Sequence, residues 1–186
     1  MTLFSFRPDK RKIKKMLEEN KVNEVIEKAV KDKKILDILF ELLDDENPGT
    51  AGDAILVLTT IISEKPEVIG KVLTEEKALR VLKLISARNP YVREGAMVFT
   101  MNAIRKYRPV YEGMRDKIVA EIGKLLEEGD KNQRGFAILL AKELKLGELK
   151  DKVEALVDVK DKVMLPFEGY KWVPLGQIAE KALKEL

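Results

Sequence analysis

The side chains best suited to recognition chemistry are the arginines and lysines between Lys77 and Lys117. This segment holds ten bases and three acids, a net charge of +7, whereas residues 41–76 hold nine acids and two lysines, a net charge of −7. The step in charge leaves two interpretations open: neighbouring segments pair across their surface, or the basic segment binds an acidic partner. Its candidate partner-binding residues are Arg80, Arg88 and Arg108.

The side chains most used in catalysis are missing from this chain of 186 residues, which contains no histidine and no cysteine. Their absence excludes histidine acid–base catalysis, a Ser-His-Asp triad, thiol nucleophiles, disulfides and the common zinc sites. No glycine-rich phosphate-binding loop occurs. The acidic run from Asp44 to Glu46 offers carboxylates to a cation but is typical of a solvated helix end. We therefore expect a non-enzymatic protein with no cofactor and no metal site.

A second basic cluster lies near the start of the chain. It alternates with Ile13, Met16 and Leu17, which is typical of a helix with one buried face and one basic, solvated face. The cluster would extend a nucleic-acid footprint only if the fold brought it near the basic segment at 77–117. Its members are Lys10, Arg11, Lys12, Lys14 and Lys15.

The composition indicates a helical protein with an aliphatic core. Hydrophobic residues make up 45% of the chain and aromatic residues only 6%, while charged residues reach 36%. This charge content, without cysteine, resembles the usage of hyperthermophile proteins. No apolar run reaches the roughly 18 residues that a membrane span needs, and the stretch Met1–Arg7 is too short for a signal peptide. We therefore predict a cytoplasmic protein that does not bind membranes.

The elements that must position these side chains are helices, and they recur along the chain. The turn at Asn89 resembles turns at Asn47 and Asp130, at offsets of about forty residues, a period typical of stacked helical hairpins. Each turn begins with a residue that caps helices well. An alanine follows at the same offset in each turn, where two helices would cross closely. These alanines are Ala54, Ala96 and Ala137.

Helical periodicity predicts one domain built from capping helices and four hairpins. The capping helices occupy residues 1–32, and the hairpins occupy residues 33–73, 74–108, 109–146 and 147–186. Two boundaries within these parts are specific predictions: Asn23 caps a helix over 23–31, and Pro109 starts a helix that continues to Glu128.

Residues 163–173 interrupt the helical pattern and predict a β-hairpin. In this hairpin Glu168–Gly169 forms a two-residue turn, Phe167 faces Tyr170, and Leu165 faces Trp172. Two roles remain open for it. It either packs down as the cap that a terminal repeat requires, or presents its aromatic side chains as a docking surface.

With these motifs the chain resembles the HEAT repeat family, including the HEAT-like form found in phycobilisome lyases. The family's signature is an Asp-Pro-x-Val-Arg-like turn followed by a helix of small residues. The turn at Asn89 matches it closely, the turn at Asp130 matches it in part, and the turn at Asn47 has Ala51 in place of the arginine. The resemblance covers about residues 33–186. It implies an all-α fold, an α–α superhelix of about four hairpins, with the small β-hairpin in the last one.

The resemblance also implies roles for single residues. In the family, turn aspartates and arginines form polar ladders between repeats, which here would be Arg93, Asp130 and Arg134. The second helix of each family hairpin lines the concave side. On the helix after Asn89, one stripe at helical spacing then supplies candidate partner contacts. The stripe contains Tyr91, Val98, Asn102 and Arg105.

HEAT arrays serve many unrelated functions, so the resemblance leaves the activity open. Our leading hypothesis is a non-enzymatic scaffold that binds a protein partner through its concave or charged surface. The alternative is nucleic-acid binding through the basic segment at 77–117. Some HEAT-like proteins are DNA glycosylases, but the single tryptophan, Trp172, falls in the predicted hairpin rather than in a basic cleft. The sequence identifies neither the partner nor the oligomeric state.

Overall fold

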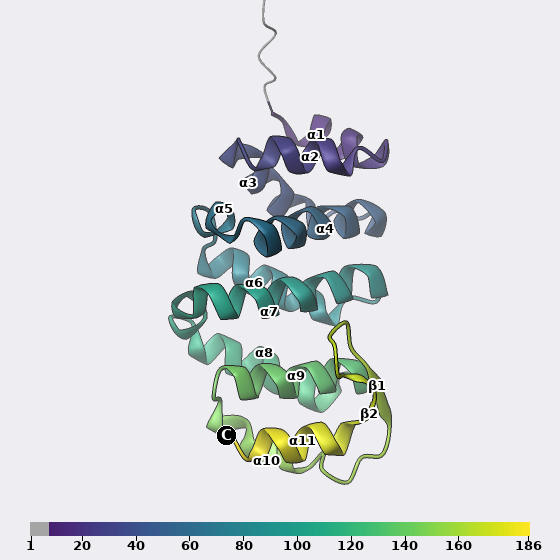
Figure 1. Ribbon diagram of the computed structural model, residues 1–186, viewed down its shortest axis with the longest axis vertical. Coiled ribbons are helices and arrows are strands. Elements are labelled where there is room, and N and C mark those ends of the chain that lie inside the picture. The colour runs from purple at the N-terminus through teal and green to yellow at the C-terminus, as the bar shows by residue number, and fades with distance from the viewer. Residues whose placement is uncertain (1–7) are drawn as a thin grey trace, which may run out of the picture. The chain divides into compact units, whose positions relative to one another are not determined.

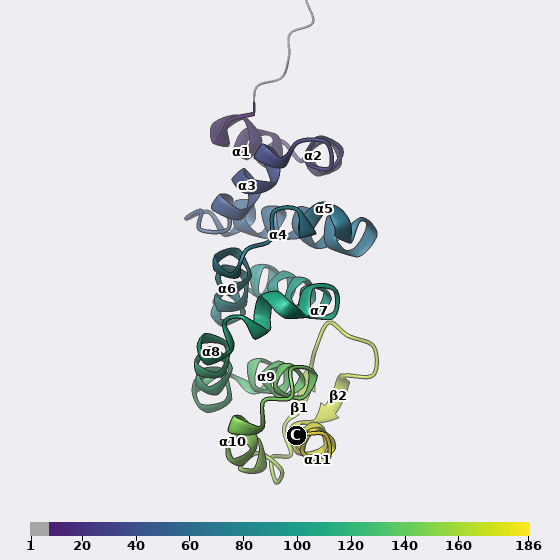
Figure 2. The same cartoon turned by 90° about the vertical axis from the view of Figure 1, so that its left-hand side faces the viewer.

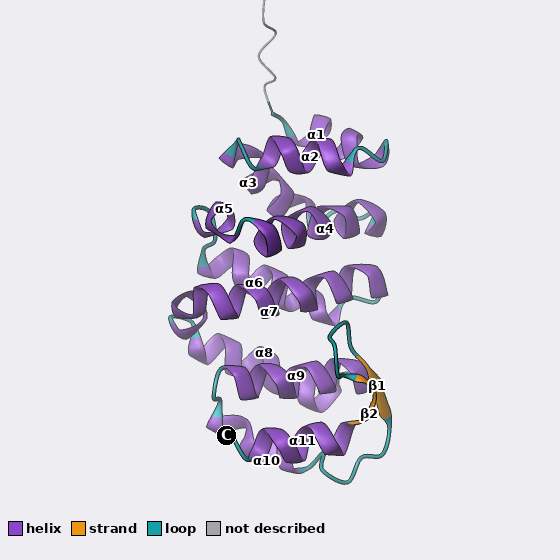
Figure 3. Cartoon of the chain, viewed as in Figure 1, coloured by secondary structure: helices purple, strands orange, loops and turns teal. Residues whose placement is uncertain are grey.

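The computed structural model describes residues 8–186, which form eleven α-helices and one two-stranded antiparallel hairpin (Figures 1 and 3). The all-α fold class with a small β-hairpin is confirmed. The described residues divide into two compact units, residues 8–73 and 74–186. The prediction about a signal peptide concerns residues 1–7, which lie outside the described residues.

The first unit consists of five helices around an aliphatic core. Helix α4 contacts α1, α2, α3 and α5 and is therefore the centre of this unit. Its buried side chains include Ile55, Leu58 and Ile62, each at most 1% exposed. The helices are α1 (Lys10–Glu18), α2 (Val22–Ala29), α3 (Lys33–Leu42), α4 (Pro48–Glu64) and α5 (Pro66–Gly70).

Asparagine and aspartate side chains begin three of these helices. Asn47 accepts a hydrogen bond from the Gly49 amide at 2.9 Å and precedes Pro48, whose missing amide proton costs nothing at the first helical position. The predicted cap at Asn23 is wrong, because α2 already begins at Val22. Asn20 adopts a left-handed φ of 59° between the two helices, and Lys21 then precedes the first helical residue, so Asn23 lies inside the first turn of α2.

The second unit arranges its helices in two layers. Figure 2 shows α6, α8 and α10 along one side and α7, α9 and α11 along the other. Consecutive helices contact one another as the pairs α6–α7, α8–α9 and α10–α11. The helices are α6 (Glu75–Lys83), α7 (Pro90–Glu112), α8 (Arg115–Glu128), α9 (Lys131–Glu143), α10 (Lys150–Glu154) and α11 (Leu175–Leu183), with 3₁₀ turns at Leu84–Ser86 and Gly147–Leu149.

Helix α7 bends near its end. Tyr107 leaves helical geometry, with φ −132° and ψ 42°, and Pro109 cannot donate the backbone hydrogen bond that would straighten the turn. The predicted helix from Pro109 to Glu128 is correct in placing a break before Pro109, where Tyr107 is non-helical, but wrong in its continuity, because α8 begins only at Arg115. Met114 breaks the helix with φ −118° and ψ 33°, and its side chain is buried.

The aligned alanines lie in the cores of their own units. Ala54 in α4, Ala96 in α7 and Ala137 in α9 are all fully buried. Each lies on the second helix of a contacting pair: α3–α4, α6–α7 and α8–α9. A methyl group at these positions lets two helices approach closely, as the repeat alignment predicts.

The hairpin lies where it was predicted, but its paired strands are shorter and their register differs. Strand β1 (Lys162–Met164) pairs with β2 (Lys171–Pro174), and a bulge shifts the register after Val163. The turn at Glu168–Gly169 is confirmed, since the Tyr170 amide donates to the Phe167 carbonyl at 3.3 Å and Gly169 has φ 81°. The predicted pairing of Leu165 with Trp172 is wrong.

The bulge explains the failed pairing. The Leu165 amide donates instead to the Tyr170 carbonyl at 3.0 Å, and Met164 pairs with Lys171. Trp172 becomes the extra residue, with a left-handed φ of 61°, and it is 66% exposed. Strict alternation predicted Trp172 on the same face as Leu165, and a bulge breaks that alternation.

The hairpin packs against the first half of α9. Gly135 permits this contact, because an added Cβ would lie 3.2 Å from Val163 Cγ1. The rings of Phe136 and Phe167 stack with centroids 5.6 Å apart, and the Met164 amide donates to Asn132 Oδ1 at 2.8 Å. The hairpin is thereby fixed so that its loop, residues 165–170, projects beside α9.

Candidate functional site

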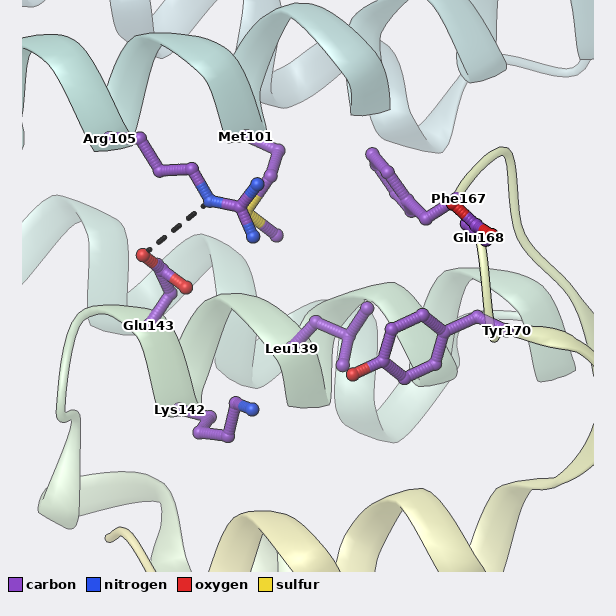
Figure 4. Close-up of a pocket in the computed structure, with 8 residues that line it drawn as sticks. All are labelled: Met101, Arg105, Leu139, Lys142, Glu143, Phe167, Glu168 and Tyr170. Carbon is purple, nitrogen blue, oxygen red and sulfur yellow. Dashed lines mark ion pairs between the residues drawn. The ribbon is translucent and has the colours of Figure 1, made fainter.

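A pocket of about 260 Å³ lies between α7, α9 and the hairpin loop (Figure 4). All three elements belong to the second unit. Helix α7 contributes Met101 and Arg105 to the lining. Helix α9 contributes Leu139, Lys142 and Glu143, and the loop contributes Phe167, Glu168 and Tyr170.

Local structure explains why these side chains converge. The residues from α7 are four positions apart and those from α9 are three and four apart, so each set lies on one helix face. The turn through Gly169 sends the chain back toward α9. Tyr170 then extends its ring from the loop toward Leu139 (Figure 4).

One wall of the pocket is held by polar contacts between α7 and α9. Arg105 Nε lies 3.7 Å from Glu143 Oε1, and Arg108 Nη2 donates to the Glu143 carbonyl at 2.7 Å. Because Glu143 is the last residue of α9, both contacts act on the C-terminal end of that helix. Cations are favourable at that end.

A second pocket of about 240 Å³ adjoins the first along α9. It shares Leu139, Lys142 and Tyr170 with the first pocket, and α11 closes its other side. We call the two pockets together the α9 groove. The residues contributed from α11 and its C-terminal end are Ile178, Lys181, Ala182, Lys184 and Glu185.

Of the predicted partner-binding residues, Arg105 lies in the α9 groove. Tyr91 is 44% exposed near the start of α7, and neither Val98 nor Asn102 lines either pocket. The stripe therefore runs along α7 but meets the groove only at its C-terminal end. Arg80, Arg88 and Arg108 also lie outside the lining.

The predicted ladder residues are brought together only in part. Arg93 Nη1 lies 3.0 Å from Asp130 Oδ2 and so connects α7 with the start of α9. Arg134 instead donates to the Glu127 carbonyl at 2.7 Å, at the end of α8. The first contact joins two helix pairs, whereas the second stays within one.

Many bases of the basic segment are neutralised inside the second unit. At least six of the ten form ion pairs there. Four of the six pair with acids from later helices or turns, at Glu121, Asp130, Glu143 and Glu148. In the last pair, the hydrogen bond from Arg115 lowers the pKa of the Glu148 carboxyl. The six bases are Arg80, Lys83, Arg93, Arg105, Arg108 and Arg115.

The N-terminal basic cluster of the first unit is paired in the same way. Lys14 Nζ donates to both carboxylate oxygens of Asp45, at 2.8 and 3.0 Å. Lys10 lies 3.9 Å from Glu41, Lys12 lies 3.7 Å from Asp9, and Lys15 lies 3.7 Å from Glu19. These contacts account for four of the five basic side chains as structural partners of nearby acids.

The sequence pointed to some groove residues and missed others. Phe167 and Tyr170 belong to the hairpin that was considered as an aromatic docking surface, but Trp172 lies outside both pockets. Leu139 and Lys142 were missed, because their role depends on a loop that lies about thirty residues further along the chain. One sequence feature could have indicated Lys142: the apolar run of α9 is interrupted at Lys142 and Glu143.

Within residues 8–186, no three acidic side chains gather closely enough to hold a metal ion. None of the helices in that range is long and apolar enough to cross a membrane. Comparison with known families finds no family model that matches this chain, and no curated protein matches it either.

Proposed function

We propose that the protein is a non-enzymatic scaffold that binds a protein partner through the α9 groove. The observation that carries the proposal is the lining of this groove. Its floor is apolar, from Leu139, Met101 and Ile178, an aromatic ring borders it, and charged side chains of both signs form its rim. An apolar centre with a polar rim is the usual composition of a protein-recognition surface.

The resemblance to HEAT repeats supports the same proposal. Helical repeats bind partners along the surface formed by the second helices of their hairpins, and α7, α9 and α11 are the second helices here. We extend the family's binding mode to this chain as a proposal only. A cytoplasmic location and membership of the HEAT family remain predictions from the sequence.

Nucleic-acid binding through the basic segment has weaker support. A phosphate backbone is bound by basic side chains that displace the counterions condensed on it, and at least six of the ten bases already have acidic partners. A salt titration separates the two functions. Nucleic-acid affinity should fall steeply as salt rises if the alternative holds, and it should be negligible even at low salt if the scaffold proposal holds.

Hydrogen exchange on a bound peptide tests the proposed site. Peptides selected from a random library by the intact protein should slow amide exchange in the second half of α9, in α11 and in the loop at 165–170. Exchange in α1 and α2 of the first unit should not change and serves as the internal control. A footprint confined to any other surface, or a library that yields no binder, would reject the α9 groove as the binding site.

A further inference from the structure

We propose that the α9 groove selects an acidic peptide segment, whose carboxylates lie at the α11 end and whose apolar side chain lies over Leu139. This inference rests on the proposed function, since it names the chemistry of the partner that the groove would bind.

The charge of the groove differs between its two ends. At the α7 end, Arg105 is paired with Glu143 at 3.7 Å and Glu168 adds a further negative charge. At the α11 end, three lysines face one acid, Glu185. The basic end therefore carries an excess of two positive charges, and the other end carries none.

Two of the lysines at the basic end are available to a ligand. Lys142 Nζ lies 3.5 Å from Glu185 Oε1. Lys181 and Lys184 have no ion pair within residues 8–186, and both side chains are exposed. A carboxylate placed between them would gain two charge-assisted contacts without displacing an acid of the protein.

The apolar floor lies directly beside these lysines. Ile178, Lys181 and Ala182 are three and four positions apart, so they share one face of α11. Ile178 is 3% exposed and Ala182 is 1% exposed, which makes them a firm floor for a small apolar side chain. Across the groove the ring of Tyr170 supplies an amphipathic wall (Figure 4).

This combination favours a peptide over a nucleic acid. Three acids border the groove, at Glu143, Glu168 and Glu185, and a continuous phosphate backbone would approach all of them. A peptide can place carboxylates at one end only and an uncharged side chain at the other. The groove thus discriminates by the position of charge as well as by its sign.

The lysines also have a purely structural explanation. Lys142 and Lys181 lie in the last turns of α9 and α11, where a cation offsets the negative end of the helix dipole. That effect stabilises a helix and requires neither an apolar floor nor an aromatic wall. A test must therefore separate binding from stability.

The test uses fluorescent synthetic peptides with a central leucine flanked by glutamates, and matched peptides with glutamine in place of glutamate. The glutamate peptide should bind the full-length protein about tenfold more tightly at low salt. Lys181→Glu combined with Lys184→Glu should weaken it by about tenfold or more. The control variant, Lys150→Glu with Lys160→Glu, makes the same charge change at exposed lysines outside the groove and should leave affinity within about threefold.

Each other outcome overturns a different statement. Equal affinity for both peptides, with the exchange footprint still on the groove, would overturn the acidic preference but leave the proposed function standing. Absence of binding by any peptide of either charge would overturn the proposed function. A mixed-sequence single-stranded oligonucleotide that displaces the glutamate peptide would overturn both in favour of nucleic acid. Retained binding by a groove variant whose melting temperature has fallen would assign the lysines to helix stability and overturn the inference.

Discussion

The two oxygens of the Asp130 carboxylate make separate contacts, one within α9 and one with α7. Oδ1 accepts from the amides of Asn132 and Gln133, both at 2.9 Å, and the Asp130 amide in turn donates to Gln133 Oε1 at 2.8 Å. Oδ2 lies 3.0 Å from Nη1 of Arg93 on α7. One side chain therefore begins α9 and ties it to the preceding helix pair.

Two substitutions separate these contributions. Asp130→Asn keeps a good capping side chain but removes the charge, so it should lower the free energy of unfolding by less than about 1 kcal/mol. Asp130→Ala removes both contacts and should cost about 1–2 kcal/mol. Urea unfolding of the two variants measures the difference. Equal losses would mean that the capping box adds no measurable stability.

A second carboxylate, Asp45, links stability to pH in the first unit. The hydrogen bond from Lys14 is the main reason why the pKa of Asp45 lies below its usual value. A lowered folded-state pKa stabilises the fold at any pH above the unfolded-state pKa of about 4. The stabilisation is lost as the pH falls from there through the folded-state pKa.

Asp45→Asn should therefore lower the melting temperature at neutral pH and reduce its further fall between about pH 5 and pH 2. Circular dichroism melts across this range provide the measurement. Glu18→Gln is the matched control, because Glu18 is exposed and lies farther from the same Lys14 Nζ, at 3.9 Å, than Asp45 does at 2.8 Å. If both variants keep the pH dependence of the unmodified protein, the Lys14–Asp45 contact does not contribute to it.

At the scale of elements, the hairpin is fixed by its buried side and not by its tryptophan. Val163 and Leu165 are at most 2% exposed, whereas Trp172 is 66% exposed. The first two side chains lie against Gly135 of α9. The hairpin thus covers α9 through aliphatic contacts and the stacked rings of Phe136 and Phe167.

Leu165→Ala should accordingly lower the free energy of unfolding by about 2–4 kcal/mol, because it leaves a cavity beneath the hairpin. Trp172→Ala should change it by less than about 0.5 kcal/mol, because the side chain buries little surface. Chemical denaturation followed by circular dichroism compares the two. A larger loss for Trp172→Ala would show that the bulged tryptophan holds the hairpin in place.

The helices were predictable wherever a short polar side chain caps them. Asn47, Thr74, Asn89 and Asp130 all accept hydrogen bonds from the first turn of the helix they precede. The hairpin register was not predictable. A bulge changes which residues face each other, and the alternation of side chains along the sequence does not reveal where a bulge lies. The groove was predictable only at Arg105 and in the hairpin aromatics, since Tyr170 meets Leu139 through tertiary packing.

At the scale of the whole molecule, the chain consists of two units with separate cores. The division falls between Leu73 and Thr74, and every residue of the α9 groove belongs to the second unit. The groove therefore needs no side chain from residues 8–73. A binding function located in the second unit should survive the loss of the first.

A fragment of residues 74–186 tests this independence. It should fold, unfold cooperatively on heating and show the helical circular dichroism of its six α-helices. A selected peptide should bind it with an affinity within about threefold of the full-length value. A fragment without a cooperative transition would show that the second unit requires the first for its stability.

The most direct test of the α9 groove compares two aromatic residues of one hairpin. Tyr170 lines both pockets of the groove, and Trp172 lines neither. With a selected peptide, Tyr170→Ala should weaken binding about tenfold or more, as removal of a central aromatic contact does. Trp172→Ala should leave the affinity unchanged. Loss of binding in Trp172→Ala with full affinity in Tyr170→Ala would contradict the assignment of function to the α9 groove.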